Sequence, residues 1–125
     1  MPIRRVASGE DGVRALLTDA SAADPAIRTA VLDSVTTPSR RSLSLAVRSF
    51  IVDRVDVTAG LADIRVPCLF VAGDDRGDWT PEAAAAAAGL TPSATAVTIA
   101  GSRTLVPLEQ PDALARELLS FWSGL

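Results

Sequence analysis

Two short, largely apolar segments, each followed at once by a glycine, constrain this chain more than any other feature. Residues 67–72 read Pro-Cys-Leu-Phe-Val-Ala before Gly73, and residues 95–100 read Thr-Ala-Val-Thr-Ile-Ala before Gly101. Runs of this kind are typical of strands that are buried on both faces of a parallel sheet. Their separation suits one strand–helix–strand unit with a right-handed crossover. The pattern therefore predicts two parallel strands joined by a helix.

Prolines mark four expected helix starts. Asp24, Thr37 and Thr80 each stand directly before a proline, which places a capping side chain ahead of a residue suited to the first helical position, and Gln110 precedes a fourth proline. The expected helices cover residues 26–35, 39–52, 82–88 and 112–122, with a weaker one over 11–20 and with Gly89 as a C-cap.

The expected helix over residues 39–52 is amphipathic. Its apolar side chains follow the helical repeat, at Leu43, Ala46, Val47, Phe50 and Ile51. We interpret these side chains as part of the hydrophobic core, and a surface that holds a partner chain or a small apolar ligand is the alternative.

Composition excludes several classes of protein. The 125 residues suit a single domain, and the net charge is −3, with acidic residues and arginines interspersed. Without a basic stripe, nucleic acid is not an expected partner. No apolar stretch is long enough for a membrane span and no secretory signal is recognisable, so we expect a cytoplasmic protein that does not bind membranes. Cys68 is the only cysteine, and we expect a buried, inert thiol.

Two further segments connect the chain to a known family. Residues 61–75 read Leu-Ala-Asp-Ile-Arg-Val-Pro-Cys-Leu-Phe-Val-Ala-Gly-Asp-Asp, and residues 101–111 read Gly-Ser-Arg-Thr-Leu-Val-Pro-Leu-Glu-Gln-Pro. Together with the closing Phe121 and Trp122, this order resembles the C-terminal portion of an α/β-hydrolase. The resemblance implies an α/β fold with a helical, cap-like region over residues 1–60. A βαβα part with parallel strands follows over residues 61–125, as an incomplete α/β-hydrolase-like sheet.

The resemblance also assigns positions to the catalytic groups of the family. Asp75 matches the acid, with Asp74 as second choice, although the usual spacing from the glycine falls on Arg76. Thr104 stands where the family has its histidine, and the chain contains no histidine and no Gly-x-Ser-x-Gly nucleophile motif. A threonine hydroxyl cannot shuttle protons near neutral pH. We therefore expect a truncated member of a hydrolase family that is inactive as an isolated chain. A histidine introduced at position 104 would acquire a raised pKa beside the acid.

Other interpretations of the same residues remain open. Asp74, Asp75 and Asp78 also fit solvated turn residues, and the absence of a histidine to orient favours that interpretation. Residues 73–77 outline a nucleophile turn with an aspartate, but they do not lead directly into a helix. The aspartates could hold Mg²⁺ or Ca²⁺, yet the spacing of a calcium-binding loop is absent, so we expect neither a metal nor a cofactor. Arg103 is expected on the surface, with anion binding as the alternative.

Size leads to an expectation about partners. Two parallel strands leave an open sheet edge and uncovered helices. We expect a homodimer to which Phe50, Leu118 and Trp122 contribute; a separately encoded hydrolase half or a third strand over residues 2–7 would serve equally. Three alternatives to an inactive hydrolase-like protein remain. The first is a non-catalytic module that binds a partner or a small-molecule ligand, and the second is a subunit that completes a hydrolase. The third is an enzyme of another kind that uses Asp75 as its only functional carboxylate.

Overall fold

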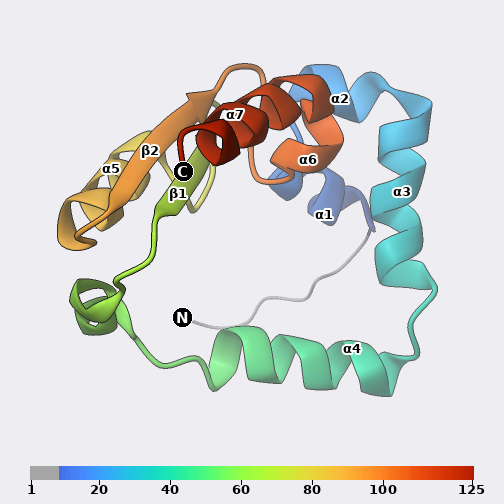
Figure 1. The fold of residues 1–125 in the computed structure, drawn as a ribbon. Coiled ribbons are helices and arrows are strands. Elements are labelled where there is room, and N and C mark those ends of the chain that lie inside the picture. The colour runs from blue at the N-terminus through green and yellow to red at the C-terminus, as the bar shows by residue number, and fades with distance from the viewer. Residues whose placement is uncertain (1–8) are drawn as a thin grey trace.

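The computed structural model describes residues 9–125, which form a small sheet with helices packed on it and a helical part to one side (Figure 1). The N-terminal part contains α1 (Gly9–Leu16), α2 (Asp19–Ala23), α3 (Pro25–Thr36), α4 (Arg40–Val47) and the π-helical η1 (Arg48–Val52). A 3₁₀ turn, η2 (Thr58–Asp63), leads into β1 (Cys68–Gly73), α5 (Pro81–Leu90), β2 (Ala94–Ile99), α6 (Val106–Glu109) and α7 (Pro111–Ser123).

The two strands pair in parallel, as the apolar segments predict. Cys68 lies opposite Ala94 at one end of the ladder and Gly73 lies opposite Ile99 at the other, and α5 connects the strands and packs on both of them. Helix α7 follows β2 and contacts it, and Figure 1 shows α7 crossing the sheet. The described part of the chain is thus an α/β structure with a two-stranded parallel sheet.

Burial of the strands on both faces was a wrong prediction. Only their carboxyl ends are buried, at Ala72, Gly73 and Ile99, whereas Thr95 and Thr98 are exposed. The reason is geometric, because two strands and the helices that contact them are too few to cover every face of the sheet.

Two helix starts follow the expected capping chemistry. The carboxylate of Asp24 accepts hydrogen bonds from the amides of Ala26 and Ile27, with Pro25 in the first turn of α3. The hydroxyl of Thr80 accepts from the amide of Ala83 in the same way and begins α5. Both caps satisfy amide groups that have no partner within the helix.

Other helix boundaries differ from the predicted ones. The N-cap of α4 is Ser39 and not Thr37, because α3 continues to Thr36 and Thr37 serves as its C-cap. Gly89 lies inside α5, whose C-cap is Thr91. The predicted helix over residues 11–20 is interrupted, since Thr18 caps a separate helix, α2.

The hydrophobic core joins the two halves of the sequence. Val13, Leu17 and Val31 are buried together in the helical part, and Leu105 and Leu108 from the segment after β2 pack against them. Residues before position 60 therefore share a core with residues after position 100.

Burial of the apolar face of residues 39–52 was also a wrong prediction. Helix α4 buries no residue, and the side chains of Phe50 and Ile51 are 77% and 69% exposed. Exposed valines follow at positions 55 and 57. Figure 1 shows the reason, since α4 lies apart from the sheet and from α7. We call residues 50–57 the apolar segment.

Three other expectations concern the burial of Cys68, the strand over residues 2–7 and membrane-spanning helices. Cys68 is half-buried rather than buried, and its Sγ lies 3.4 Å from the carbonyl oxygen of Val66. The suggested strand over residues 2–7 lies outside the described residues. Among residues 9–125, no helix is long and apolar enough to cross a membrane.

Candidate functional site

The positions that the resemblance assigns to acid and base lie in the turns after the two strands. Because parallel strands end at the same edge of the sheet, these turns approach each other. The amide of Asp74 donates to the carbonyl of Ile99 at 3.2 Å, and the amide of Asp75 donates to the carbonyl of Ser102 at 3.0 Å. Asp74 is exposed, and its Oδ1 accepts from the amide of Gly101 at 2.8 Å. Gly101 has a φ of +72°, a conformation that favours glycine.

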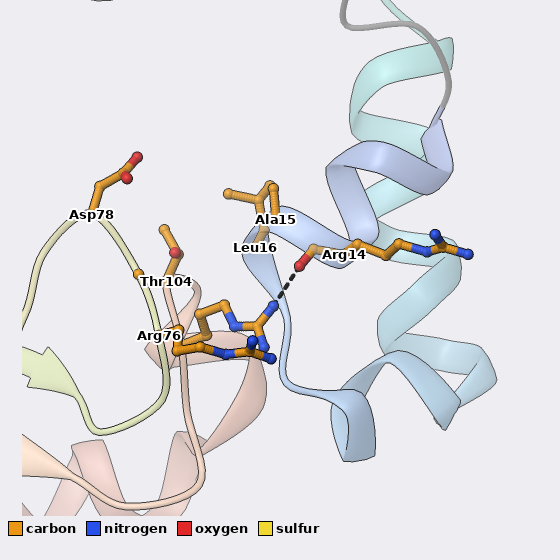
Figure 2. A pocket seen from close by; sticks show the side chains of 8 residues that line it. Arg14, Ala15, Leu16, Arg76, Asp78 and Thr104 are labelled. Atoms are coloured by element: carbon orange, nitrogen blue, oxygen red, sulfur yellow. Dashed lines mark hydrogen bonds between the residues drawn. The ribbon is translucent and has the colours of Figure 1, made fainter.

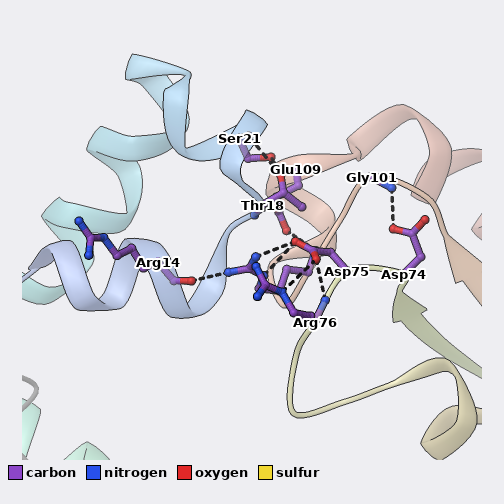
Figure 3. A network of polar contacts seen from close by, with 9 residues as sticks. Arg14, Thr18, Ser21, Asp74, Asp75, Arg76, Gly101 and Glu109 are labelled. Atoms are coloured by element: carbon purple, nitrogen blue, oxygen red, sulfur yellow. Dashed lines mark hydrogen bonds and ion pairs between the residues drawn. The ribbon is translucent and has the colours of Figure 1, made fainter.

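Asp75 is engaged in an ion pair with Arg103. Nε and Nη2 of Arg103 lie 3.1 and 2.7 Å from the same carboxylate oxygen, Oδ2 (Figure 3). The other oxygen, Oδ1, accepts from the amide of Arg76 at 2.8 Å. The hydrogen bonds from Arg103, and then the one from the Arg76 amide, hold the pKa of Asp75 below its usual value.

Arg103 is buried, so its expected place on the surface was wrong. Only 8% of the residue is exposed, and its Nη1 donates to the carbonyl of Arg14 at the end of α1. All three kinds of guanidinium nitrogen thus have partners inside the protein. A charge at this depth is stabilised by the carboxylate that faces it.

Glu109 forms a second buried tie at this place, which sequence analysis did not single out. Its Oε1 accepts from the amide of Thr18 at 2.7 Å and its Oε2 accepts from the amide of Arg103 at 2.8 Å. The residue is 7% exposed. One carboxylate therefore joins the turn between α1 and α2 to the turn after β2 (Figure 3). A glutamate in the short segment between two prolines carries no local signal of such a role.

Thr104 lies beside this network without a direct link to the acid. Its amide donates to the carbonyl of Leu16 at 3.2 Å. Its hydroxyl makes no hydrogen bond with the residues that the structure describes, and the residue is exposed. The structure thus brings Asp75 and Thr104 to neighbouring turns, and Arg103 takes the hydrogen bonds of the Asp75 carboxylate.

An open pocket of about 530 Å³ lies between the end of α1 and these turns, beside the hydrogen bonds that join them. Three segments line it: Arg14, Ala15 and Leu16 from α1, Arg76, Gly77 and Asp78 after β1, and Arg103 and Thr104 after β2. Figure 2 shows that the carboxylate of Asp78 and the guanidinium of Arg14 point away from Thr104.

Two other interpretations of the aspartates, a metal site and a nucleophile turn, are not supported by the described part of the chain. No three His, Cys, Asp or Glu side chains among residues 9–125 are grouped as metal ligands. β1 ends at Gly73 and α5 begins only at Pro81, so the turn between them does not lead directly into a helix. Comparison with protein-family models, curated proteins and solved structures gives no match for this chain.

Proposed function

We propose that this chain is an α/β-hydrolase-like module that does not hydrolyse esters by itself and acts by binding. The observation that carries the proposal is the Asp75–Arg103 ion pair. Both Nε and Nη2 of Arg103 bind one oxygen of Asp75, and the amide of Arg76 binds the other. An acid in a hydrolase triad must instead orient an imidazole and stabilise its cation.

The group at the base position supports the same proposal. Thr104 carries a hydroxyl that does not titrate near neutral pH, so it cannot accept and return a proton as imidazole does. Loss of one triad member leaves about 10³- to 10⁴-fold acceleration over water in hydrolases that retain their other groups. The chain also has no Gly-x-Ser-x-Gly motif. A hydrolytic reaction would lack both the nucleophile and the base.

A chromogenic acyl ester assay on the purified chain tests this proposal. We expect the rate with the wild-type chain to equal the rate in buffer, and Asp75→Ala and Asp74→Ala to behave in the same way. Turnover that persists through purification and disappears in Asp75→Ala alone would show that Asp75 is a catalytic acid and would overturn the proposal.

The exposed apolar segment favours a second candidate function, association with another chain. Phe50, Ile51, Val55 and Val57 are each between 69% and 77% exposed, and Trp122 on α7 is 59% exposed. Contiguous exposed apolar surfaces of more than a few hundred Å² are unusual on soluble monomers. A homodimer about a twofold axis is the simplest way to cover this surface, and a complementing hydrolase chain would cover it as well.

Sedimentation at micromolar concentrations tests the homodimer. We expect a concentration-dependent dimer that Phe50→Asp weakens, while Ser49→Asp, which adds the same charge to the exposed neighbour, has a smaller effect. A compact monomer at every concentration would exclude the homodimer.

A further inference from the structure

The pocket beside Thr104 carries an unbalanced positive charge. Asp75 is the carboxylate closest to two guanidinium groups: Nη2 of Arg103 lies 2.7 Å from its Oδ2, and Nε of Arg76 lies 3.8 Å from its Oδ1. The two other charged side chains that line the pocket, those of Arg14 and Asp78, point away from Arg76 (Figure 2). The other carboxylate of the network, that of Glu109, binds the amides of Thr18 and Arg103 and does not line the pocket. At the pocket itself, one carboxylate therefore faces two cations, which leaves an excess of about one positive charge there.

The two arginines have different roles in this group. Arg103 is buried and its guanidinium nitrogens bind Asp75 and the carbonyl of Arg14, so it holds Asp75 in place. The side chain of Arg76 is 86% exposed and its single ion pair within residues 9–125 is the long one to Asp75. Most donors of Arg76 thus face solvent at the mouth of the pocket.

The rest of the pocket supplies one hydroxyl and an apolar wall. The hydroxyl of Thr104 makes no hydrogen bond with the described residues, as noted above, and lines the same space as Arg76. Ala15 and Leu16 line it from the end of α1, and Figure 2 shows their side chains on the side of Thr104 that faces away from Arg76. Across the pocket, the charged guanidinium of Arg76 is therefore followed by the neutral hydroxyl of Thr104 and then by the apolar side chains of Ala15 and Leu16.

We propose that this pocket binds a small monocarboxylate with a short apolar chain. Arg76 and the hydroxyl of Thr104 hold the carboxylate, and the apolar chain lies against Ala15 and Leu16. The planar fork of a guanidinium matches the two oxygens of a carboxylate, which supports this ligand class. The use of Thr104 as a donor rests on the proposed function, in which Thr104 takes no part in proton transfer.

Charge favours a monocarboxylate over a phosphate. Near neutral pH, inorganic phosphate is a mixture of its monoanion and its dianion, and phosphate esters carry about −1.5 to −2 charges. Only one positive charge is in excess here, and Asp75 repels any further negative charge. The hydrophobic wall adds nothing to the binding of an ion without an apolar part. Because Arg76 is largely in water, its attraction to the ligand is weakened, and we expect dissociation constants of about 1 mM.

Titration with sodium butyrate at constant ionic strength, followed by amide and arginine side-chain NMR signals, tests the proposal. We expect saturable shifts at Arg76, Gly77 and Thr104, and weaker binding by about 3- to 10-fold in Arg76→Gln and in Thr104→Val. Arg116→Gln removes the same charge from an exposed position on α7 and should leave the affinity unchanged. Arg76→Gln changes an exposed side chain, so its amide spectrum should retain the native pattern.

Butanol and inorganic phosphate distinguish the contribution of the ligand's charge from that of its apolar chain. Butanol lacks the charge and should cause no saturable shift, and phosphate should bind more weakly than butyrate. Absence of saturable shifts with butyrate, equal affinities in wild type and Arg76→Gln, or tighter binding of phosphate would each overturn the proposal. Hydrolysis in the ester assay would contradict the proposed function but would not alter these binding results, so the two failures are distinguishable.

Discussion

Gly73 lies so close to Ser102 that no side chain fits between them. A Cβ placed on Gly73 would stand 2.3 Å from the carbonyl oxygen of Ser102, and the carbonyl of Arg103 would be 2.6 Å away. Both neighbours are backbone atoms, which cannot move without displacing the turn after β2. The close approach of the two turns, and with it the Asp75–Arg103 pair, therefore depends on glycine at this position.

Gly73→Ala should consequently destabilise the protein and disturb the site. We expect a loss of about 1–3 kcal/mol in the free energy of unfolding, because overpacking forces the backbone to shift. Urea denaturation measures this loss. Gly89→Ala is the matched control, since Gly89 lies within α5 with open space around it, and alanine there should stabilise by about 0.4–1 kcal/mol. Equal stability of Gly73→Ala and wild type would mean that the two turns can separate freely.

Glu109→Gln tests the buried tie between the helical part and the turn after β2. Glutamine offers one acceptor oxygen where the carboxylate serves two amides, those of Thr18 and Arg103. One buried amide then faces an NH₂ group, which should cost about 1–3 kcal/mol. Denaturant unfolding measures the difference, with Asp33→Asn on the exposed face of α3 as a control that should stay within about 0.5 kcal/mol of wild type. If both variants lose equally little, Glu109 does not hold the two parts together.

The ion pair of Asp75 predicts a specific dependence of stability on pH. Its pKa is lowered in the folded protein by the hydrogen bonds from Arg103 and from the Arg76 amide. Such a group stabilises the fold at pH values above its unfolded pKa of about 3.9, and this contribution is lost as the pH falls through the lower, folded pKa. The difference in unfolding free energy between wild type and Asp75→Asn should therefore be constant near neutral pH and shrink below about pH 4. A difference that does not change down to strongly acidic pH would contradict this.

The pKa of the histidine in Thr104→His distinguishes the hydrolase arrangement, in which the acid is available to the histidine, from the observed one, in which Arg103 binds the acid. In a hydrolase, an available acid would raise the pKa of this histidine. Here Arg103 already binds Asp75, and Arg76 lines the same pocket, so the neighbouring cations should lower the pKa of the imidazole below its ordinary value. An NMR titration reports it cleanly, because the chain has no other histidine. Adding Arg76→Gln should move the pKa upward again. A raised pKa in Thr104→His alone would show that Asp75 is free to act as an acid.

Local rules account for the parts of the fold that were predicted correctly. The strands and the caps at Asp24 and Thr80 depend on residues close in sequence, and the structure contains all of them. Parallel pairing follows from the length of the connection between the strands, which leaves room for a crossover helix. Sequence analysis also identified Asp74 and Asp75 as turn residues after the first strand. The structure brings this turn next to the one that holds Thr104, because parallel strands end at the same edge of the sheet. The misplaced boundaries, such as Ser39 in place of Thr37, arise where two acceptable caps compete within a few residues.

The sequence by itself determined the two strands and most of the longer helices, whereas only the tertiary structure decided which side chains are buried. Arg103 is buried and Phe50 is exposed, the reverse of what their types suggest. Burial depends on what covers a residue: the Arg103 guanidinium is held between Asp75 and the end of α1, far away in the chain, and no element of the described fold covers Phe50. Contacts across such sequence distances leave no periodic pattern, so the ion pair that defines the candidate site appears only when the chain is folded.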